Sequence, residues 1–158
     1  MKTLLYGIGN ISRQDDAVGI WCAERLERWS SETGITGVDV DATYQLQIED
    51  SAKVAEYDRV LFLDASVLPI SHVHLEPLEP IVDATHTTHS VSPACVLGLC
   101  RELYGRTPEG YAVHIRGNAF ELGAPVTGDA AANLERAVLF VQEFLTASSP
   151  TVHSRRTP

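Results

Sequence analysis

Two patterns of apolar and polar positions alternate along the chain: short continuous apolar runs, and longer segments with helical spacing. Residues 4–6, 38–40 and 59–64 are predicted strands, and the last contains the continuous apolar run 60–63. Continuous apolar runs are typical of strands in a parallel sheet that is covered on both faces. We therefore expect central strands at these positions.

Between the first two runs, Val18, Cys22, Leu26 and Trp29 recur at the spacing of a helix with one buried face. Charged residues stand between them, and Gly34 follows where the C-terminus of a helix is expected. The pattern predicts a helix that connects the first two strands.

A second predicted helix has strong signals at both ends. Ser92 followed by Pro93 is typical of an N-cap and a first helical residue, and Gly105 is typical of a C-terminal stop. Leu97 and Cys100 lie on its apolar face. We expect a helix between Pro93 and Gly105.

The rest of the chain continues the alternation of strands and helices. Apolar residues between Leu134 and Leu145 predict a last amphipathic helix, and we expect a short helix at residues 47–55 and strands at residues 72–75 and 111–115. Together these segments predict an α/β fold, a three-layer sandwich with about five mostly parallel strands and helices on both faces.

The composition limits the size and the partners of the protein. A chain of 158 residues that is 44% hydrophobic can bury one sizeable core, so we expect one domain over residues 1–147 and a polar, disordered tail over residues 148–158. The net charge of −9 would repel nucleic acids and anionic lipids. Without a stretch apolar enough for a membrane span, we expect a cytoplasmic protein with no membrane partner, and a monomer.

Candidate chemistry follows the strands, where ligands bind in open α/β sheets. Asp16 follows the first strand, Asp41 the second and Asp64 the third, and His89 lies in the loop before the Ser92 helix. Two carboxylates and an imidazole at Asp16, Asp64 and His89 would suit a divalent transition metal with open coordination positions. The same carboxylates would repel a phosphate.

Each of these residues also has a structural interpretation. Asp15 and Asp16 could simply complement the positive end of a helix dipole. Asp64 could cap a turn, although burying a carboxylate at the end of an apolar strand is unfavourable unless it has partners. His89 could cap the helix that follows it.

Several short motifs in order resemble a known family. They are Gly7-Ile8-Gly9-Asn10, Asp15-Asp16-Ala17-Val18-Gly19, Leu63-Asp64-Ala65 and Thr87-Thr88-His89. In order and spacing they resemble the hydrogenase maturation endopeptidases, from residue 1 to about the last helix.

The resemblance implies a cytosolic protease that removes the C-terminal extension of a nickel-iron hydrogenase large-subunit precursor after nickel insertion. It implies that Asp16, Asp64 and His89 form the catalytic and metal-contacting site, and that the nickel is carried by the substrate rather than by the free enzyme. Either the metal or a carboxylate would then activate the attacking water.

Other segments differ from the usual family pattern. Many members have Asp-Gly-Gly where this chain has Asp41-Ala42-Thr43, and the segments 44–47, 115–117 and 120–123 resemble the branch that serves NAD-linked soluble hydrogenases. We expect Asp41, Gln45 and Arg116 to contact the substrate peptide.

Two other functions remain possible from the sequence. The first is a non-catalytic maturation checkpoint that binds nickel or a partner without cleaving it. The second is a nucleotide-binding module, suggested by the turn at Gly7 and Gly9. Ser12, at the position of the third glycine in the dinucleotide fingerprint, and the neighbouring carboxylates argue against that module.

Overall fold

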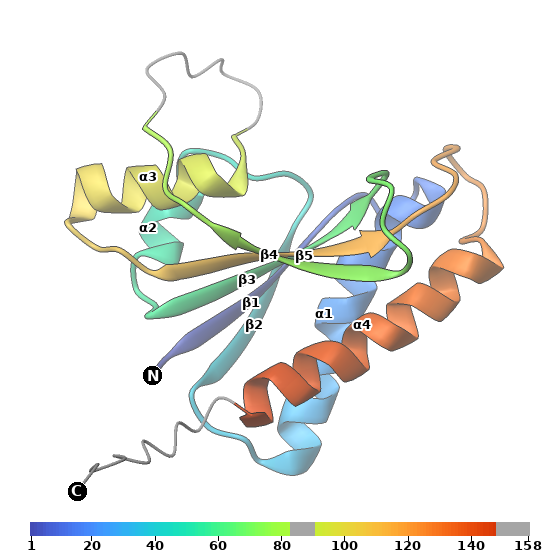
Figure 1. The fold of residues 1–158 in the computed structure, drawn as a ribbon, viewed down its shortest axis with the longest axis horizontal. Coiled ribbons are helices and arrows are strands. Elements are labelled where there is room, and N and C mark those ends of the chain that lie inside the picture. Colours follow the sequence, from blue (N-terminus) through green and yellow to red (C-terminus); the bar gives the residue numbers. More distant parts are fainter. Residues whose placement is uncertain (83–90, 148–158) are drawn as a thin grey trace, which may run out of the picture.

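The structure, a computed structural model, describes residues 1–82 and 91–147. Its centre is a five-stranded sheet with strand order β2-β1-β3-β5-β4, in which β4 alone is antiparallel to its neighbour (Figure 1). The strands are β1 (Thr3–Ile8), β2 (Val38–Thr43), β3 (Arg59–Ser66), β4 (Val73–Leu78) and β5 (Glu109–Arg116).

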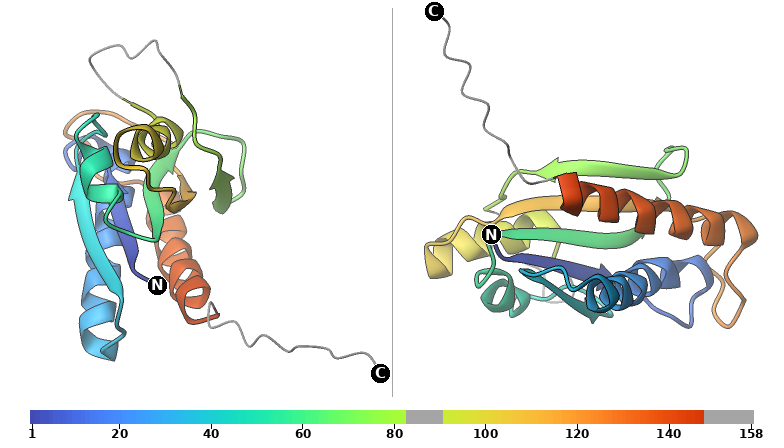
Figure 2. Two further views of the ribbon diagram at one scale, coloured as in Figure 1. Left: turned by 90° about the vertical axis from the view of Figure 1, so that its left-hand side faces the viewer. Right: turned by 90° about the horizontal axis from the view of Figure 1, so that it is seen from below.

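Helices cover both faces of this sheet (Figure 2). On one face lie α1 (Val18–Thr33) and α4 (Gly128–Ala147), and on the other lie α2 (Asp50–Val54) and α3 (Pro93–Tyr104). Alternate residues of β1 and β3 point into the two resulting apolar cores, which explains why these strands read as continuous apolar runs. The predicted fold class is confirmed, but β2, which was expected to be a central strand, lies at the edge of the sheet and is largely exposed.

The helix ends follow the predicted signals. Gly34 ends α1 and Gly105 ends α3, both with positive φ, at 67° and 62°. The hydroxyl of Ser92 accepts a hydrogen bond from the backbone N–H of Cys95 at 3.2 Å, and Pro93 is the first residue of α3. The last helix begins at Gly128, well before the apolar stripe that identified it.

The strands are longer than expected, which corrects the placement of two carboxylates. Asp41 was predicted to follow its strand and Asp64 to stand at the end of its strand, but both strands continue past these residues. Backbone pairing accounts for the extra length: β2 stays paired with β1 as far as Thr43, and β3 stays paired with β5 as far as Ser66. Apolar side chains mark only the buried part of a strand, whereas backbone hydrogen bonds continue past it.

Three further predictions concern the segment with Asp15 and Asp16, the C-terminal tail and the absence of a membrane span. Asp15 and Asp16 lie in a short 3-10 helix, η1 (Gln14–Ala17), that precedes α1. The predicted tail at residues 148–158 lies outside the described residues. Over residues 1–82 and 91–147, no helix combines the length and apolar character needed to cross a membrane.

Candidate functional site

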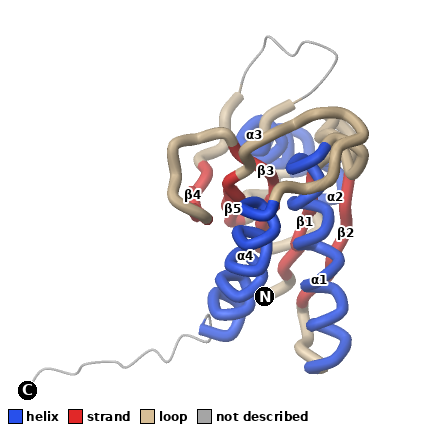
Figure 3. The backbone as a smooth tube through the Cα atoms, turned by 90° about the vertical axis from the view of Figure 1, so that its right-hand side faces the viewer, coloured by secondary structure: helices blue, strands red, loops and turns tan. Residues whose placement is uncertain are grey.

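A polar pocket of about 310 Å³ lies at the carboxyl ends of β1 and β3. From β1 the chain runs to β2 on one side, and from β3 it continues to the strands on the other, so the pocket occupies the switch point of the sheet. Figure 3 shows loops gathered at this end of the sheet. The pocket is lined by Ile8, Gly9, Asn10, Arg13, Asp16, Tyr44, Gln45, Leu46, Asp64, Val91 and Pro93.

Asp16 reaches this pocket because the chain turns sharply after β1. Gly9 has a φ of 149°, and a Cβ atom there would lie 2.1 Å from the backbone oxygen of Asp16, so only glycine fits. The backbone N–H of Asn10 donates a hydrogen bond of 2.7 Å to the Asp16 carboxylate. This contact orients Asp16 while the carboxylate still lines the pocket.

Asp64 enters the same pocket from β3, the central strand. Burial raises the pKa of its carboxyl to about 7, and the nearby negative charge of Asp16 adds to the increase, although the N–H of Ala65 opposes it. At neutral pH the Asp64 carboxyl therefore exchanges readily between its charged and neutral forms, as a general acid or base requires.

Gly19 allows the start of α1 to approach both carboxylate-bearing segments. A Cβ atom at Gly19 would lie 2.4 Å from the backbone oxygen of Ile8, 2.5 Å from that of Leu63 and 3.1 Å from the Cα of Asp64. Any side chain would push the helix away from β1 and β3. The glycine thus brings η1, at the start of this helix, close to Asp64.

Asp15 has a different role from its neighbour. It is completely buried, and its carboxylate accepts hydrogen bonds from the backbone N–H groups of Asn118, Ala119 and Thr127 at 2.8–3.0 Å and from the Thr127 hydroxyl at 2.8 Å. Burial alone would raise its pKa, but these donors outweigh burial and lower the pKa of Asp15 below its usual range.

We call this group of contacts the Asp15 latch, comprising Asp15, Asn118, Ala119 and Thr127. It fixes η1 to the loop between β5 and α4. Sequence reasoning considered Asp15 only as a complement to a helix dipole. Its partners stand 103 to 112 positions later, so no local pattern could reveal them.

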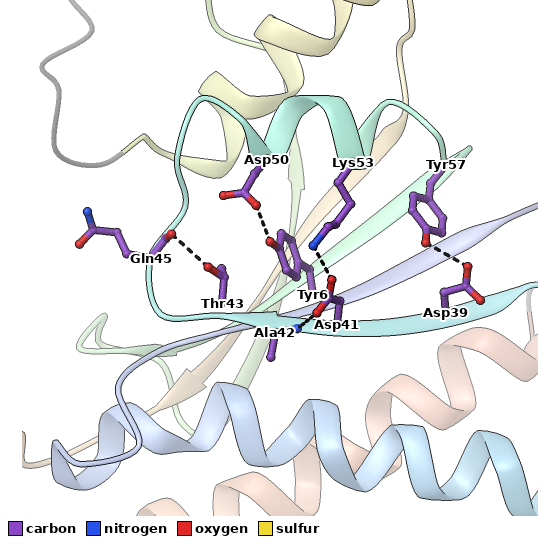
Figure 4. A network of polar contacts seen from close by, with 9 residues as sticks. All are labelled: Tyr6, Asp39, Asp41, Ala42, Thr43, Gln45, Asp50, Lys53 and Tyr57. Atoms are coloured by element: carbon purple, nitrogen blue, oxygen red, sulfur yellow. Dashed lines mark hydrogen bonds and ion pairs between the residues drawn. The ribbon is translucent and has the colours of Figure 1, made fainter.

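Gln45 and Arg13 form part of the pocket rim. The side-chain amide of Gln45 points away from the hydrogen bond between its own backbone oxygen and Thr43 (Figure 4). Arg13 lies over the ring of Phe120 and donates from Nε to the backbone oxygen of that residue at 3.2 Å. Arg13, a cation at the edge of an acidic pocket, was not identified from the sequence.

Asp41 does not line this pocket. Its carboxylate pairs with Lys53 of α2 and accepts the backbone N–H of Ala42 (Figure 4). Burial tends to raise the pKa of Asp41, but the bond and charge of Lys53 and the Ala42 N–H together lower it. Beside it, the Tyr6 hydroxyl donates to Asp50. These contacts fasten α2 to the sheet. The predicted substrate contact at Asp41 remains untested.

Arg116 also lies away from Asp16 and Asp64. It ends β5 and lines a second pocket, of about 470 Å³, together with residues of α4 and of the loop between β3 and β4. Of the predicted site residues, Asp16, Asp64 and Gln45 are thus brought together, whereas Asp41 and Arg116 are not.

His89 lies outside the described residues. Val91 and Pro93, shortly after it in the chain, line the pocket with Asp16 and Asp64. Within residues 1–82 and 91–147, no group of three or more His, Cys, Asp or Glu side chains is arranged to hold a metal ion. The three-residue set Asp16, Asp64 and His89 therefore stays a prediction.

Several solved structures share this architecture. The chain matches the NiFe hydrogenase maturation protease HycI from Thermococcus kodakarensis KOD1 with a TM-score of 0.69 at 21% identity, covering 92% of each chain. It matches the hydrogenase maturating endopeptidase HybD from E. coli with a TM-score of 0.69 at 21% identity, covering 94% of each chain. An endopeptidase from Escherichia coli gives a TM-score of 0.72 at 22% identity over 94% of both chains.

This chain has the fold of the hydrogenase maturation proteases. The shared fold extends over almost the full length of each of these chains. It therefore includes the carboxyl ends of β1 and β3, where Asp16 and Asp64 lie. No protein-family model matches the sequence, and no curated protein is detectably similar to it.

Proposed function

We propose that this protein is an endopeptidase that removes the C-terminal extension of a nickel-iron hydrogenase large-subunit precursor after nickel insertion. The observation that carries the proposal is the pairing of Asp16 with Asp64 in one open polar pocket, with the pKa of Asp64 near 7. The pocket stands at the switch point of a fold shared with maturation proteases.

The pocket offers carboxyl groups for hydrolysis of a peptide bond. In the charged form, Asp64 takes a proton from a water molecule, whose oxygen attacks the scissile carbonyl carbon. As the C–N bond breaks, Asp64 returns that proton to the leaving nitrogen. A pKa near 7 before nickel binds makes both protonation states accessible at neutral pH, and a nickel ion beside Asp64 would favour the charged form that accepts the proton. Asp16, oriented by the Asn10 N–H, places its carboxyl group beside the reacting groups.

The nickel ion in this proposal belongs to the substrate. Asp16, Asp64 and His89 would contact it, since carboxylates and an imidazole are suitable ligands for a divalent transition metal. A precursor without nickel would bring no cation to offset the mutual repulsion of Asp16 and Asp64. Cleavage would therefore wait for metallation, and the metal would polarise the scissile carbonyl.

The test compares nickel-loaded and nickel-free precursors of a hydrogenase large subunit. Each is incubated with the wild-type protein and with the Asp16→Asn and Asp64→Asn variants, and precursor mass is followed over time. Glu24→Gln is the matched control, because it removes an exposed carboxylate from α1, away from the pocket. We expect only the loaded precursor to lose a C-terminal peptide, with Glu24→Gln active and the two pocket variants at least about 100-fold slower.

The alternative is a non-catalytic maturation checkpoint that binds nickel or a partner. It predicts nickel-dependent association of the precursor with no change in its mass. Cleavage that proceeds equally without nickel, and equally in both pocket variants, would contradict the proposed site itself.

A further inference from the structure

The second pocket contains two arginines that lack an acidic partner. Arg116 and Arg136 both line it, and neither forms a salt bridge within the described part of the chain. Two unpaired guanidinium groups facing one cavity favour an anionic ligand.

The contacts of Arg116 hold its guanidinium in place without neutralising it. One terminal nitrogen, Nη1, donates to the backbone oxygens of Leu68 and Ile70 at 2.7 and 3.2 Å. Its Nε is buried and has no hydrogen-bond partner among the described residues. The guanidinium is thus fixed by neutral carbonyls and keeps its full positive charge.

A buried amide connects the two sides of this pocket. Asn133, only 4% exposed, donates from Nδ2 to the backbone oxygen of Arg116 at 3.0 Å. Its Oδ1 lies 3.0 Å from Nδ1 of His72 and 3.4 Å from Nη1 of Arg136. Asn133 therefore fixes the positions of β5, α4 and the loop before β4 relative to one another.

The charge balance of the pocket favours a carboxylate. Asp129 also lines it, so the two arginines and this carboxylate give the pocket a formal net charge of +1, which one carboxylate of a ligand balances. Arginine binds a carboxylate through two parallel hydrogen bonds. The pocket has a volume of about 470 Å³, which is large enough for an acidic side chain or a chain terminus.

The two pockets lie at the same end of the sheet, where the parallel strands have their carboxyl ends. Asp64 of β3 is directly opposite His114 of β5, and Arg116 stands two residues further along β5. From strand geometry, the Cα atoms of Asp64 and Arg116 are about 8 Å apart. The backbone N–H of Asn118, which also lines the second pocket, donates to Asp15, next to Asp16. A peptide in the first pocket could reach the second within about three or four residues.

We propose that Arg116 and Arg136 form a subsite for a carboxylate of the substrate peptide, a few residues from the bond that is cleaved. This inference rests on the proposed function for the identity of the peptide. The binding of a carboxylate itself can be tested without cleavage.

The binding test titrates the isotope-labelled protein with two blocked hexapeptides that differ only in one glutamate or glutamine, and follows amide NMR signals. We expect the glutamate peptide to shift signals of Asn118 and Asn133, and the glutamine peptide to leave them unchanged. The variant Arg136→Gln should weaken binding about ten-fold. Arg28→Gln, an exposed arginine of α1 outside the pocket, should not alter it.

Three results would overturn the subsite: equal shifts with both peptides, unchanged binding in Arg136→Gln, or tighter binding of inorganic phosphate than of the glutamate peptide. Arg136→Gln is preferred to Arg116→Gln. Arg136 is exposed on α4 and its guanidinium donates to Asn133 within the same helix, so its replacement should leave the fold intact.

A kinetic test connects the subsite to the substrate. With a cleavable precursor, Arg136→Gln should raise KM about ten-fold and leave kcat unchanged. When the acidic residues of the extension are replaced by neutral ones, wild type and Arg136→Gln should have the same KM. A precursor amidated at its C-terminus separates a side-chain carboxylate from the terminal one. If no precursor is cleaved, the proposed function fails while the peptide titration still decides the subsite. An equal rise in KM for neutral and acidic precursors would overturn it.

Discussion

Asp15, which is completely buried, and Asp64, which is partly buried, lie at the same end of the sheet, yet their environments differ. In the Asp15 latch, three N–H groups and a hydroxyl meet the carboxylate and lower its pKa. At Asp64, burial and the charge of Asp16 raise the pKa to about 7. The comparison teaches that the number of hydrogen-bond donors around a carboxylate matters more than its degree of burial. The donors decide whether the group stays charged and stabilises the fold or can exchange a proton near neutral pH.

The largest effect is expected from removing the Asp15 latch. Asp15→Ala leaves three backbone N–H groups and the Thr127 hydroxyl without their acceptor, so the free energy of unfolding should fall by about 3 kcal/mol. Urea denaturation at pH 7 measures the change. Glu24→Ala, on the exposed surface of α1, is the control and should change it little.

The same latch predicts a dependence on pH. Because the pKa of Asp15 is lowered in the folded state, its stabilising contribution is complete above the unfolded value, about 4, and is lost as the pH falls through the folded value. The stability difference between wild type and Asp15→Asn should therefore shrink in acid. A difference that stays constant from pH 7 to about 2 would contradict this account.

Asp64 should show the opposite sign. Its pKa is raised, so the folded state prefers the neutral form and wild-type stability falls as the pH rises from about 4 to about 7. Asp64→Asn should therefore exceed wild-type stability by on the order of 2 kcal/mol at pH 8 and match it at about pH 4. Parallel denaturation curves for the two proteins across that range would be the contrary result.

A smaller effect isolates the contribution of Asp16. Asp16→Asn removes the neighbouring charge, so the pKa of Asp64 should fall below its present value of about 7 but stay above that of an exposed aspartate, because burial remains. Carbon NMR of the aspartate carboxyl groups follows this titration. An unchanged Asp64 titration would mean that burial alone sets its pKa.

The smallest effect is expected at Asp41, whose partner Lys53 is also exposed. Asp41→Asn should lower the free energy of unfolding by less than about 1 kcal/mol, and 1 M salt should remove most of the difference. The titration of Asp64 should be unaffected. A larger loss of stability would show that α2 depends on this ion pair.

The fold was predictable because its signals are local. Gly34, Ser92 and Gly105 mark helix ends through their own backbone or side-chain chemistry, and continuous apolar runs locate the strands covered on both faces. Asp16 and Asp64 were found as candidates because they follow such runs closely.

What could not be predicted depends on contacts between distant segments. The partners of Asp15 are 103 to 112 positions away, and its burial is evident only once the loop after β5 is in place. Arg116 was identified as a polar residue near a strand end, but the pocket that it lines requires α4 and the loop before β4. The extra length of β2 and β3 comes from backbone pairing, which leaves no apolar pattern.

The Asp15 latch also bears on the order of events during synthesis. A ribosome releases the chain from its N-terminus, so every described residue of the first pocket emerges before Thr127. Until then, the turn that carries Asp16 lacks the contacts that join it to the loop after β5. The nascent chain thus displays its carboxylates before they are fixed in place, and the site is completed only when the C-terminal part of the protein folds.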